Sequence, residues 1–294
     1  MTKIKRKSKG LTYFIWLFNL VALVIILFYF HRPIIKYSFR FYRWYVYRQP
    51  LPQSGKVLAV DYPAYKIHGF DISHFQPEID WKNVRGLAKN GDTIPFKFVF
   101  IKATEGTWWE DELFFEHWEK ARKNGIIRGA YLYFHANKNP EEQAENFIES
   151  VKLVAGDLPP VIDVEETKKM SKKEIVSAIK RCAKVLEDKY HVKPILYSSR
   201  YFIEDYLLDD FSDYQFWIAH YYKNEMDATD IPWMFWQHTD KASLLSGAKI
   251  DANVFRGTKY DLQALLLTYP EAEKPKPPVK TMLNKQMKIV KKRH

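Results

Sequence analysis

The sequence predicts an α/β fold, an irregular (β/α) barrel over residues 66–267, and three observations carry this prediction. Short apolar runs of strand length alternate with stretches of helical periodicity, which favours parallel βαβ units. Eight such runs occur in this one region, and eight strands are typical of a closed barrel. Too few residues separate the last three runs to hold full helices, so we expect the final third to be irregular.

The expected strands are, in chain order, 66–73, 96–103, 128–134, 159–164, 193–198, 215–221, 234–238 and 249–255. The expected helices lie near 110–124, 140–153, 171–190 and 200–208. The helix over 171–190 has the clearest pattern, because its apolar residues recur at helical spacing and Ser171 with Glu174 forms a capping box. Cys182, the only cysteine, lies on its apolar face, so we expect a buried thiol and no intrachain disulfide.

Residues 11–30 form a nearly continuous apolar run of 20 residues, the length that crosses a bilayer as one helix. Five basic residues precede it, and neither a small-residue cleavage site nor a lipid-acceptor cysteine follows it. We therefore predict a single-pass signal-anchor, a cytoplasmic basic tail at 1–10 and a barrel on the extracytoplasmic side, periplasmic or cell-surface. Residues 31–65 are expected to be a juxtamembrane segment and linker, and 268–294 a flexible basic tail.

The positive charge of the chain lies at its two ends. The formal net charge is +11, yet residues 51–265 hold 28 basic and 33 acidic residues, a net charge of −5. A nucleic-acid-binding surface would need basic side chains on the folded domain. The charge distribution therefore argues against nucleic acid as a partner, and the sequence gives no sign of an oligomeric state.

Acidic residues stand at or near the ends of several expected strands. Asp71 lies near the end of the first strand, Glu105 just past the second, Asp163 and Glu165 at the end of the fourth, and Asp251 in the last. The active site of such a barrel lies at the carboxyl ends of its strands. Carboxylates that meet there raise one another's pKa, and a carboxyl kept protonated suits glycosidic-bond cleavage, because the leaving oxygen must take a proton.

The triplet Asp163–Val164–Glu165 is the sharpest of these features. Residues i and i+2 of a strand point to the same side. We therefore expect both carboxyls to face the barrel mouth and Val164 to point outward into the packed layer. A D-x-E triplet is common by chance, but its place after an apolar run makes this one a candidate catalytic pair.

The ordered segments resemble glycoside hydrolase family 25, the Chalaropsis-type lysozymes that cleave the muramic acid to glucosamine linkage of peptidoglycan. The segments that carry the resemblance are HGFDISHFQPEIDW (68–81), FVFIKATEGTWWEDELF (98–114), RGAYLYF (128–134), EEQAENF (141–147), LPPVIDVEE (158–166), FWIAHY (216–221), FWQHT (235–239) and the late Asp251. The resemblance implies a modified (β/α) barrel, muramidase activity and peptidoglycan glycan strands as the partner. It also implies that Glu165 is the general acid, supported by Asp71, Asp163 and Asp251.

One position departs from the family pattern. The third strand of the family usually reads Tyr-His-Phe, whereas this chain has Tyr131–Leu132–Tyr133. The carboxylates are intact, so we expect Leu132 to alter the fit of the substrate rather than the chemistry.

Aromatic side chains on barrel strands pack against sugar rings in some barrels and fill the core in others. Tyr131 and Trp236, which lie in the family motifs, and Tyr197 are the residues that we expect to bind substrate. Glu105 is a further candidate, which either touches sugar or holds Lys102 or a backbone turn.

The expected chemistry has two forms. Glu165 would donate a proton to the glycosidic oxygen and then activate water, while Asp163 stabilises the cation-like transition state by orienting the 2-acetamido group of the sugar. Direct displacement by a carboxylate is the alternative.

Two other functions fit the sequence less well. A non-catalytic barrel that tethers glycan to the membrane is disfavoured because every acidic position is present, and a chitinase-like glycosidase because VIDVEE lacks a longer run of acids. The sequence contains no HExxH motif, no Cys/His spacing typical of zinc, no phosphate loop and no nucleophile elbow. It therefore predicts neither a metal nor a cofactor.

Overall fold

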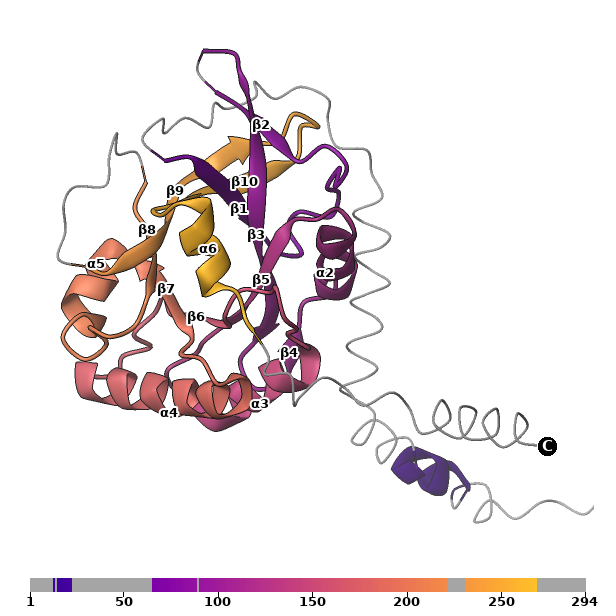
Figure 1. Cartoon of the computed structure of the whole chain (residues 1–294). Coiled ribbons are helices and arrows are strands. Elements are labelled where there is room, and N and C mark those ends of the chain that lie inside the picture. Colours follow the sequence, from indigo (N-terminus) through magenta and orange to yellow (C-terminus); the bar gives the residue numbers. More distant parts are fainter. Residues whose placement is uncertain (1–12, 14, 23–64, 89, 222–230, 269–294) are drawn as a thin grey trace, which may run out of the picture. The chain divides into compact units, whose positions relative to one another are not determined.

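The computed structural model describes residues 13, 15–22, 65–88, 90–221 and 231–268. The chain divides into two compact units, 1–53 and 54–294, and the second holds the barrel (Figure 1). In the first unit, the described residues are helical and largely exposed. No helix among the described residues is long and apolar enough to cross a bilayer. Most of the predicted anchor, and the segments 1–10, 31–64 and 269–294, lie outside the described residues, so these predictions stay predictions.

Eight strands close the barrel, which confirms the predicted fold. They are β1 (Ile67–Ile72), β3 (Thr93–Glu105), β5 (Ile127–Tyr133), β6 (Val161–Asp163), β7 (Ile195–Ser199), β8 (Phe216–Ala219), β9 (Trp233–Ser243) and β10 (Lys249–Phe255). Each strand pairs with the next in this order, and β10 pairs back with β1 (Figure 1). The pairs from β1 to β9 are parallel, whereas β10 is antiparallel to both of its neighbours.

The reversal at β10 makes the end of the barrel irregular, as the sequence predicted. A tight turn over 244–248 joins β9 to β10, with the amide of Leu244 donating to the carbonyl of Ala248 at 2.9 Å. Five residues leave no room for a helix, so β10 must run back along β9.

The helices fall within the expected regions. They are α2 (Phe114–Lys123), α3 (Pro140–Ser150), α4 (Lys172–Tyr190) and a short α5 (Arg200–Phe202) that continues as a π-helical turn, η1 (Ile203–Leu207). Both hydrogen bonds of the capping box at Ser171 are present, and Cys182 is fully buried, as expected. Three short elements were not predicted: β2 (Arg85–Leu87), β4 (Trp109–Glu110) and α6 (Lys259–Leu265). The sequence carried a signal for α6, because Thr258 and Asp261 form a second capping box.

The interior of the barrel is filled by aromatic rings. Phe100 stacks on Trp217 with their ring centroids 4.3 Å apart. The rings fit because glycine faces them: a Cβ at Gly69 would lie 2.4 Å from the Phe98 ring, and one at Gly129 2.5 Å from the Phe100 ring. This packed floor closes the barrel beneath the ends of the strands, so a substrate can approach only from the mouth.

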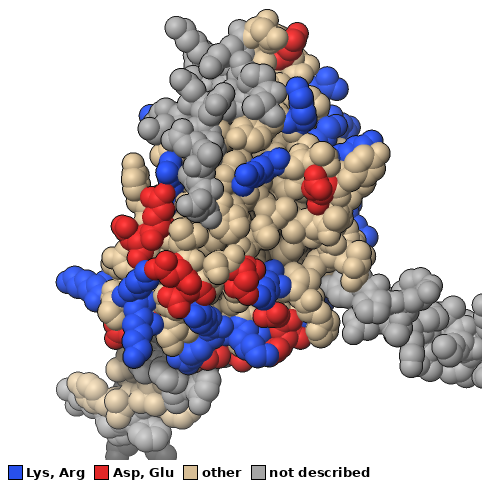
Figure 2. Space-filling view, turned by 60° about the vertical axis from the view of Figure 1, so that its left-hand side comes forward, with Lys and Arg blue, Asp and Glu red and all other residues tan. Residues whose placement is uncertain are grey.

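Basic and acidic side chains are intermixed on the face that Figure 2 shows. Three cations along α4 have acidic partners: Lys172 with Asp209 and Lys180 with Asp210, both at 2.9 Å, and Arg181 with Glu141 at 2.6 Å. Nucleic acid is bound by continuous basic surfaces, whereas the charges on this face are of both signs.

Candidate active site

The four predicted catalytic carboxylates lie at one end of the barrel. Asp71 is the next-to-last residue of β1, Asp163 ends β6, and Glu165 follows two residues later. Asp251 stands directly opposite Asp71 in the β1–β10 pairing. Because β10 is antiparallel, its beginning reaches the end where the other strands finish. The structure therefore brings together residues that lie up to 180 positions apart in the chain.

Asp71 is held by two side-chain amides. One of its oxygens, Oδ2, accepts hydrogen bonds from Nε2 of Gln237 at 2.8 Å and from Nδ2 of Asn253 at 2.7 Å. All three residues are buried. Hydrogen bonds to a buried carboxylate are charge-assisted and stronger than those between neutral groups, so this oxygen is fixed as an acceptor.

The orientation of both amides is set by a further layer of donors. The indole N–H of Trp217, which can only donate, points to Oδ1 of Asn253 at 2.7 Å. The hydroxyls of Tyr197 and Tyr221 both donate to Oε1 of Gln237 at 2.7 Å. Each amide oxygen is therefore occupied, and each amide nitrogen is left to face the carboxylate.

Asp71 and Asp251 oppose each other's ionisation. Burial raises the pKa of Asp71 well above its usual range, the charge of Asp251 raises it further, and the two amide donors lower it. Burial, with the charges of Asp240 and Glu165, raises the pKa of Asp251 to about 6. Near neutral pH this pair therefore holds its protons more tightly than free carboxyls do.

Asp163 and Glu165 form the second acidic pair. Asp163 is buried, and its Oδ1 has no hydrogen-bond partner among the described residues. Burial raises its pKa well above the usual range, and the charge of Glu165 adds to this. Glu165 is exposed to solvent, accepts a hydrogen bond from the hydroxyl of Tyr133, and has a pKa raised by the partial loss of water around it. As predicted, Val164 between them points into the outer core.

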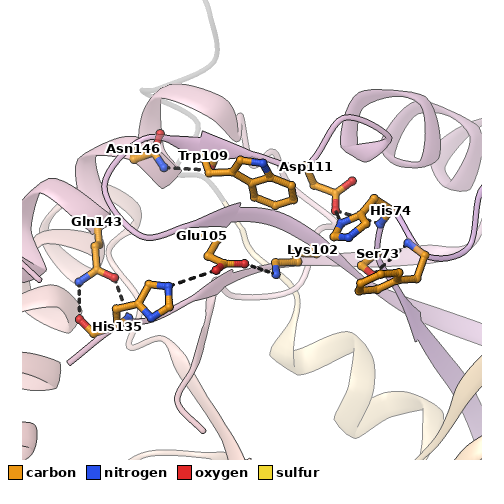
Figure 3. A network of polar contacts seen from close by, with 10 residues as sticks. Ser73, His74, Lys102, Glu105, Trp109, Asp111, His135, Gln143 and Asn146 are labelled. Carbon is orange, nitrogen blue, oxygen red and sulfur yellow. Dashed lines mark hydrogen bonds and ion pairs between the residues drawn. The ribbon is translucent and has the colours of Figure 1, made fainter. Parts of the chain in front are cut away.

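A cation lies beside this pair. Nζ of Lys102 is 2.7 Å from Oε2 of Glu105 and packs against the rings of Trp109 and Tyr133, 5.2 and 4.8 Å from their centroids. Figure 3 shows Glu105 between this ammonium and the ring of His135, whose Nε2 is 3.1 Å from Oε1. Partial burial alone would raise the pKa of Glu105, but the hydrogen bonds and charges of Lys102 and His135 lower it. The structure thus shows Glu105 holding Lys102, one of the roles expected for it, and its part in binding sugar stays a prediction.

The predicted substrate-binding aromatics occupy different places. Tyr131 and Tyr197 point into the barrel and are nearly buried, at 9% and 5% exposure. Trp236 is fully buried in the outer core, and its indole N–H donates to the carbonyl of His220 at 2.8 Å. Successive side chains of a strand point to opposite faces. Phe235 and Gln237, the neighbours of Trp236 in β9, face the inside of the barrel, so Trp236 faces outward. The structure gives Trp236 no surface with which to contact sugar.

Leu132 also differs from its expected role. Its side chain is fully buried in the outer core, between the sheet and the helices, whereas Tyr131 and Tyr133 point the other way. A side chain on the outer face of β5 cannot touch a ligand at the mouth. Leu132, the residue that departs from the family pattern, therefore affects the packing between sheet and helices and makes no direct contact with substrate.

Sequence reasoning missed Gln237 and Asn253, which hold Asp71. A signal was available, since Asn253 follows Asp251 by two positions and so shares its inward face. Among the residues that the structure describes, no three His, Cys, Asp or Glu side chains are grouped so as to hold a metal ion. The arrangement offers two pairs of carboxyls with raised pKa values, beside one cation, a combination suited to general acid–base chemistry.

The comparisons with known proteins agree with this chemistry. The family model described as glycosyl hydrolases family 25 matches residues 70–246. The uncharacterized protein YegX of Escherichia coli (strain K12) is 41% identical over 214 residues, which cover 72% of this chain and 78% of that protein. An N,O-diacetylmuramidase of Arthroderma benhamiae is 34% identical over 149 residues, covering 48% and 60% of the two chains. The structure of a family 25 glycosyl hydrolase from Bacillus anthracis superposes with a TM-score of 0.63 at 31% identity, covering 72% of this chain and 98% of that one.

Proposed function

The chain belongs to glycosyl hydrolases family 25, and from this premise we propose that it is a peptidoglycan hydrolase in which Glu165 is the general acid and base. The bond cleaved is the β-1,4 linkage between N-acetylmuramic acid and N-acetylglucosamine. Members of this family are lysozymes or muramidases, and peptidoglycan is the substrate that such a domain implies.

One observation supports this assignment above the others. Asp163 and Glu165 lie on the same side at the end of β6, and both have raised pKa values. Glu165 is the member of the pair that is exposed to solvent, so it is the one that can reach a glycosidic oxygen. A protonated, accessible carboxyl beside a buried one is what protonation of a leaving group requires.

The cleavage step uses the two residues differently. Glu165 gives its proton to the glycosidic oxygen as the bond from C1 breaks, and the carbonyl oxygen of the 2-acetamido group attacks C1. The amide N–H of that group donates to the carboxylate of Asp163, which keeps an exposed fraction of 5%. This hydrogen bond favours ionised Asp163, and the pair then keeps its remaining proton on Glu165.

Water completes the reaction. Glu165, now ionised, removes a proton from a water molecule that adds to C1, and the ring formed by the acetamido group opens. Such substrate-assisted hydrolysis is one of the known routes of glycosidases. If a carboxylate attacked C1 directly instead, a covalent adduct of sugar and enzyme would accumulate in a slow variant, and intact-mass measurement would detect it.

We also propose that residues 11–30 anchor the enzyme in a membrane with the barrel on the extracytoplasmic side, where peptidoglycan lies. The support is the sequence: an apolar run of 20 residues behind a basic amino-terminal segment. An integral protein stays in the membrane pellet at alkaline pH and is released only by detergent. Release by carbonate alone would rule out the anchor.

The test of the function uses full-length protein in nonionic detergent with purified peptidoglycan. The released fragments are reduced and analysed by mass spectrometry. Reduced muramic acid at the new ends would establish muramidase activity, and reduced glucosamine would make the enzyme a glucosaminidase. Retention of uncleaved glycan would point to a tether, and cleavage of chitin oligomers but not of peptidoglycan to a chitinase-like enzyme.

A further inference from the structure

A pocket of about 760 Å³ lies at the opposite end of the barrel from the carboxylates. It is bordered by Ile67 and Ile127, the first residues of β1 and β5, and by the segment that follows the last residue of β10. Parallel strands begin here and the antiparallel β10 ends here, so this is the amino-terminal end of the barrel. Helix α6 forms one wall, through Leu262 and its neighbours.

The pocket is strongly basic. Four cationic side chains line it, those of Lys66, Lys97, Arg256 and Lys259, together with one acidic residue, Asp261. The carboxylate of Asp261 is already engaged, because the backbone amide and the hydroxyl of Thr258 donate to it, both at 2.7 Å.

None of the four cations forms an ion pair with a described residue. This contrasts with α4, where Lys172, Lys180 and Arg181 each have an acidic partner. Arg256 and Lys259 contact the rings of Trp233 and Tyr260, 5.0 and 4.9 Å from their centroids, but these contacts neutralise no charge. Four cations without an acidic partner among the described residues, on a domain whose net charge is −5 over 51–265, form a local positive field. Such a field attracts anions.

The floor of the same pocket is apolar. Ile67 and Leu262 are buried, Ile127 is half-buried beside them, and the three side chains belong to the inner core of the barrel. A simple anion such as inorganic phosphate would use the cations and leave this floor uncovered. A ligand with an anionic group joined to an apolar part would use both.

We propose that this pocket binds an anionic phospholipid. The lysines and Arg256 contact the phosphate, for which guanidinium and ammonium groups are well suited, and the glycerol and first acyl carbons cover the apolar floor. The chain's own carboxyl-terminal segment is excluded as the occupant by charge, since residues 266–294 contain eight basic and two acidic residues.

The proposed lipid site would orient the enzyme. Tyr65, the first described residue of the barrel domain, lines the pocket, so the chain enters the domain beside it. A bilayer at this end would leave the carboxylates facing away from the membrane. The inference does not depend on muramidase activity, because the pocket and the carboxylates lie at opposite ends of the barrel.

The test measures lipid binding by native mass spectrometry of full-length protein in nonionic detergent. The probes are dihexanoyl phosphatidylglycerol, dihexanoyl phosphatidylcholine and inorganic phosphate. The variant is Lys97→Gln/Arg256→Gln, and the matched control is Lys172→Gln/Lys180→Gln on α4. We expect the wild type to bind phosphatidylglycerol more tightly than the other two probes. The pocket variant should bind phosphatidylglycerol with an affinity lower by roughly tenfold or more. The control variant should bind it with the affinity of the wild type.

Several results would overturn the proposal. Equal binding of the two lipids would mean that charge is not recognised, and phosphate binding as tight as phosphatidylglycerol would identify a site for free phosphate. An unchanged pocket variant would place the lipid elsewhere, for example at residues 11–30. Lys66→Glu, a single change at an exposed position, must weaken binding in the same way, which guards against a folding defect of the double variant.

Discussion

Replacing Asn253 by aspartate tests the network that holds Asp71, because the change keeps the size of the side chain and alters only its hydrogen-bonding character. In the wild type, Nδ2 of Asn253 donates to Oδ2 of Asp71 at 2.7 Å. In Asn253→Asp, a carboxylate oxygen takes the place of this donor while the other oxygen still accepts from Trp217. Two buried carboxylate oxygens would then stand in hydrogen-bond contact with no proton between them.

The expected cost follows from the lost bond. A hydrogen bond to a charged group contributes about 1.5–3 kcal/mol, and in a domain of this size each kcal/mol shifts the melting temperature by roughly 2–4 °C. At pH 8 we therefore expect Asn253→Asp to melt about 3–12 °C below the wild type. Repulsion raises the pKa of the new pair, so its folded form binds a proton more tightly than the unfolded chain does. Stability is then lost as pH rises, and the deficit should shrink toward pH 5, where a shared proton restores an O–H···O bond.

The assay is thermal denaturation followed by circular dichroism at pH 5 and pH 8. The control is Asp71→Asn, whose side-chain oxygen can still accept from both Gln237 and Asn253, so its deficit should be no larger at pH 8 than at pH 5 although activity is lost. An equal deficit of Asn253→Asp at both pH values, or the same pH-dependent deficit in Asp71→Asn, would refute the proposed network.

Three further predictions concern single residues. Arg128 is 2% exposed, and its guanidinium donates to the carboxylate of Asp157 at 2.7 Å. Asp157→Asn removes this buried counter-charge, so denaturant titration should show a free energy of unfolding lower by about 3–5 kcal/mol. Because burial raises the pKa of Asp251 from 3.8 to about 6, this carboxyl should cost the folded protein up to about 3 kcal/mol of stability as pH rises from 4 to 6. Melting curves of Asp251→Asn should show a loss over this range that is smaller by that contribution. Lys102 lowers the pKa of Glu165, so in Lys102→Met the alkaline limb of the kcat/KM profile should move to higher pH, whereas Lys102→Arg should keep the wild-type profile.

The sequence predicted those parts of the site that depend on strand periodicity. The alternation of side chains was enough to place Asp163 and Glu165 on one face and Val164 on the other. The barrel itself followed from the count and spacing of apolar runs, because closure requires only that each strand find a neighbour on both sides.

The remaining features depend on contacts between segments distant in the sequence. The direction of β10 is set by the turn at 244–248, and only this reversal places Asp251 opposite Asp71. Trp236 lies in a motif of the family, but the motif does not state which face of β9 it occupies, and its inward neighbour Gln237 carries the polar contact to Asp71.

The proposed chemistry depends on Glu165, and the rate of cleavage without its carboxyl measures that dependence. The rate of release of reducing ends from purified peptidoglycan is compared for the wild type and Glu165→Gln, with circular dichroism to show that both are folded. Loss of a positioned general acid slows such reactions by roughly 10²–10⁴-fold, so we predict a folded variant with a rate reduced to that extent. A folded Glu165→Gln variant that releases muramic acid ends at close to the wild-type rate would contradict the assignment.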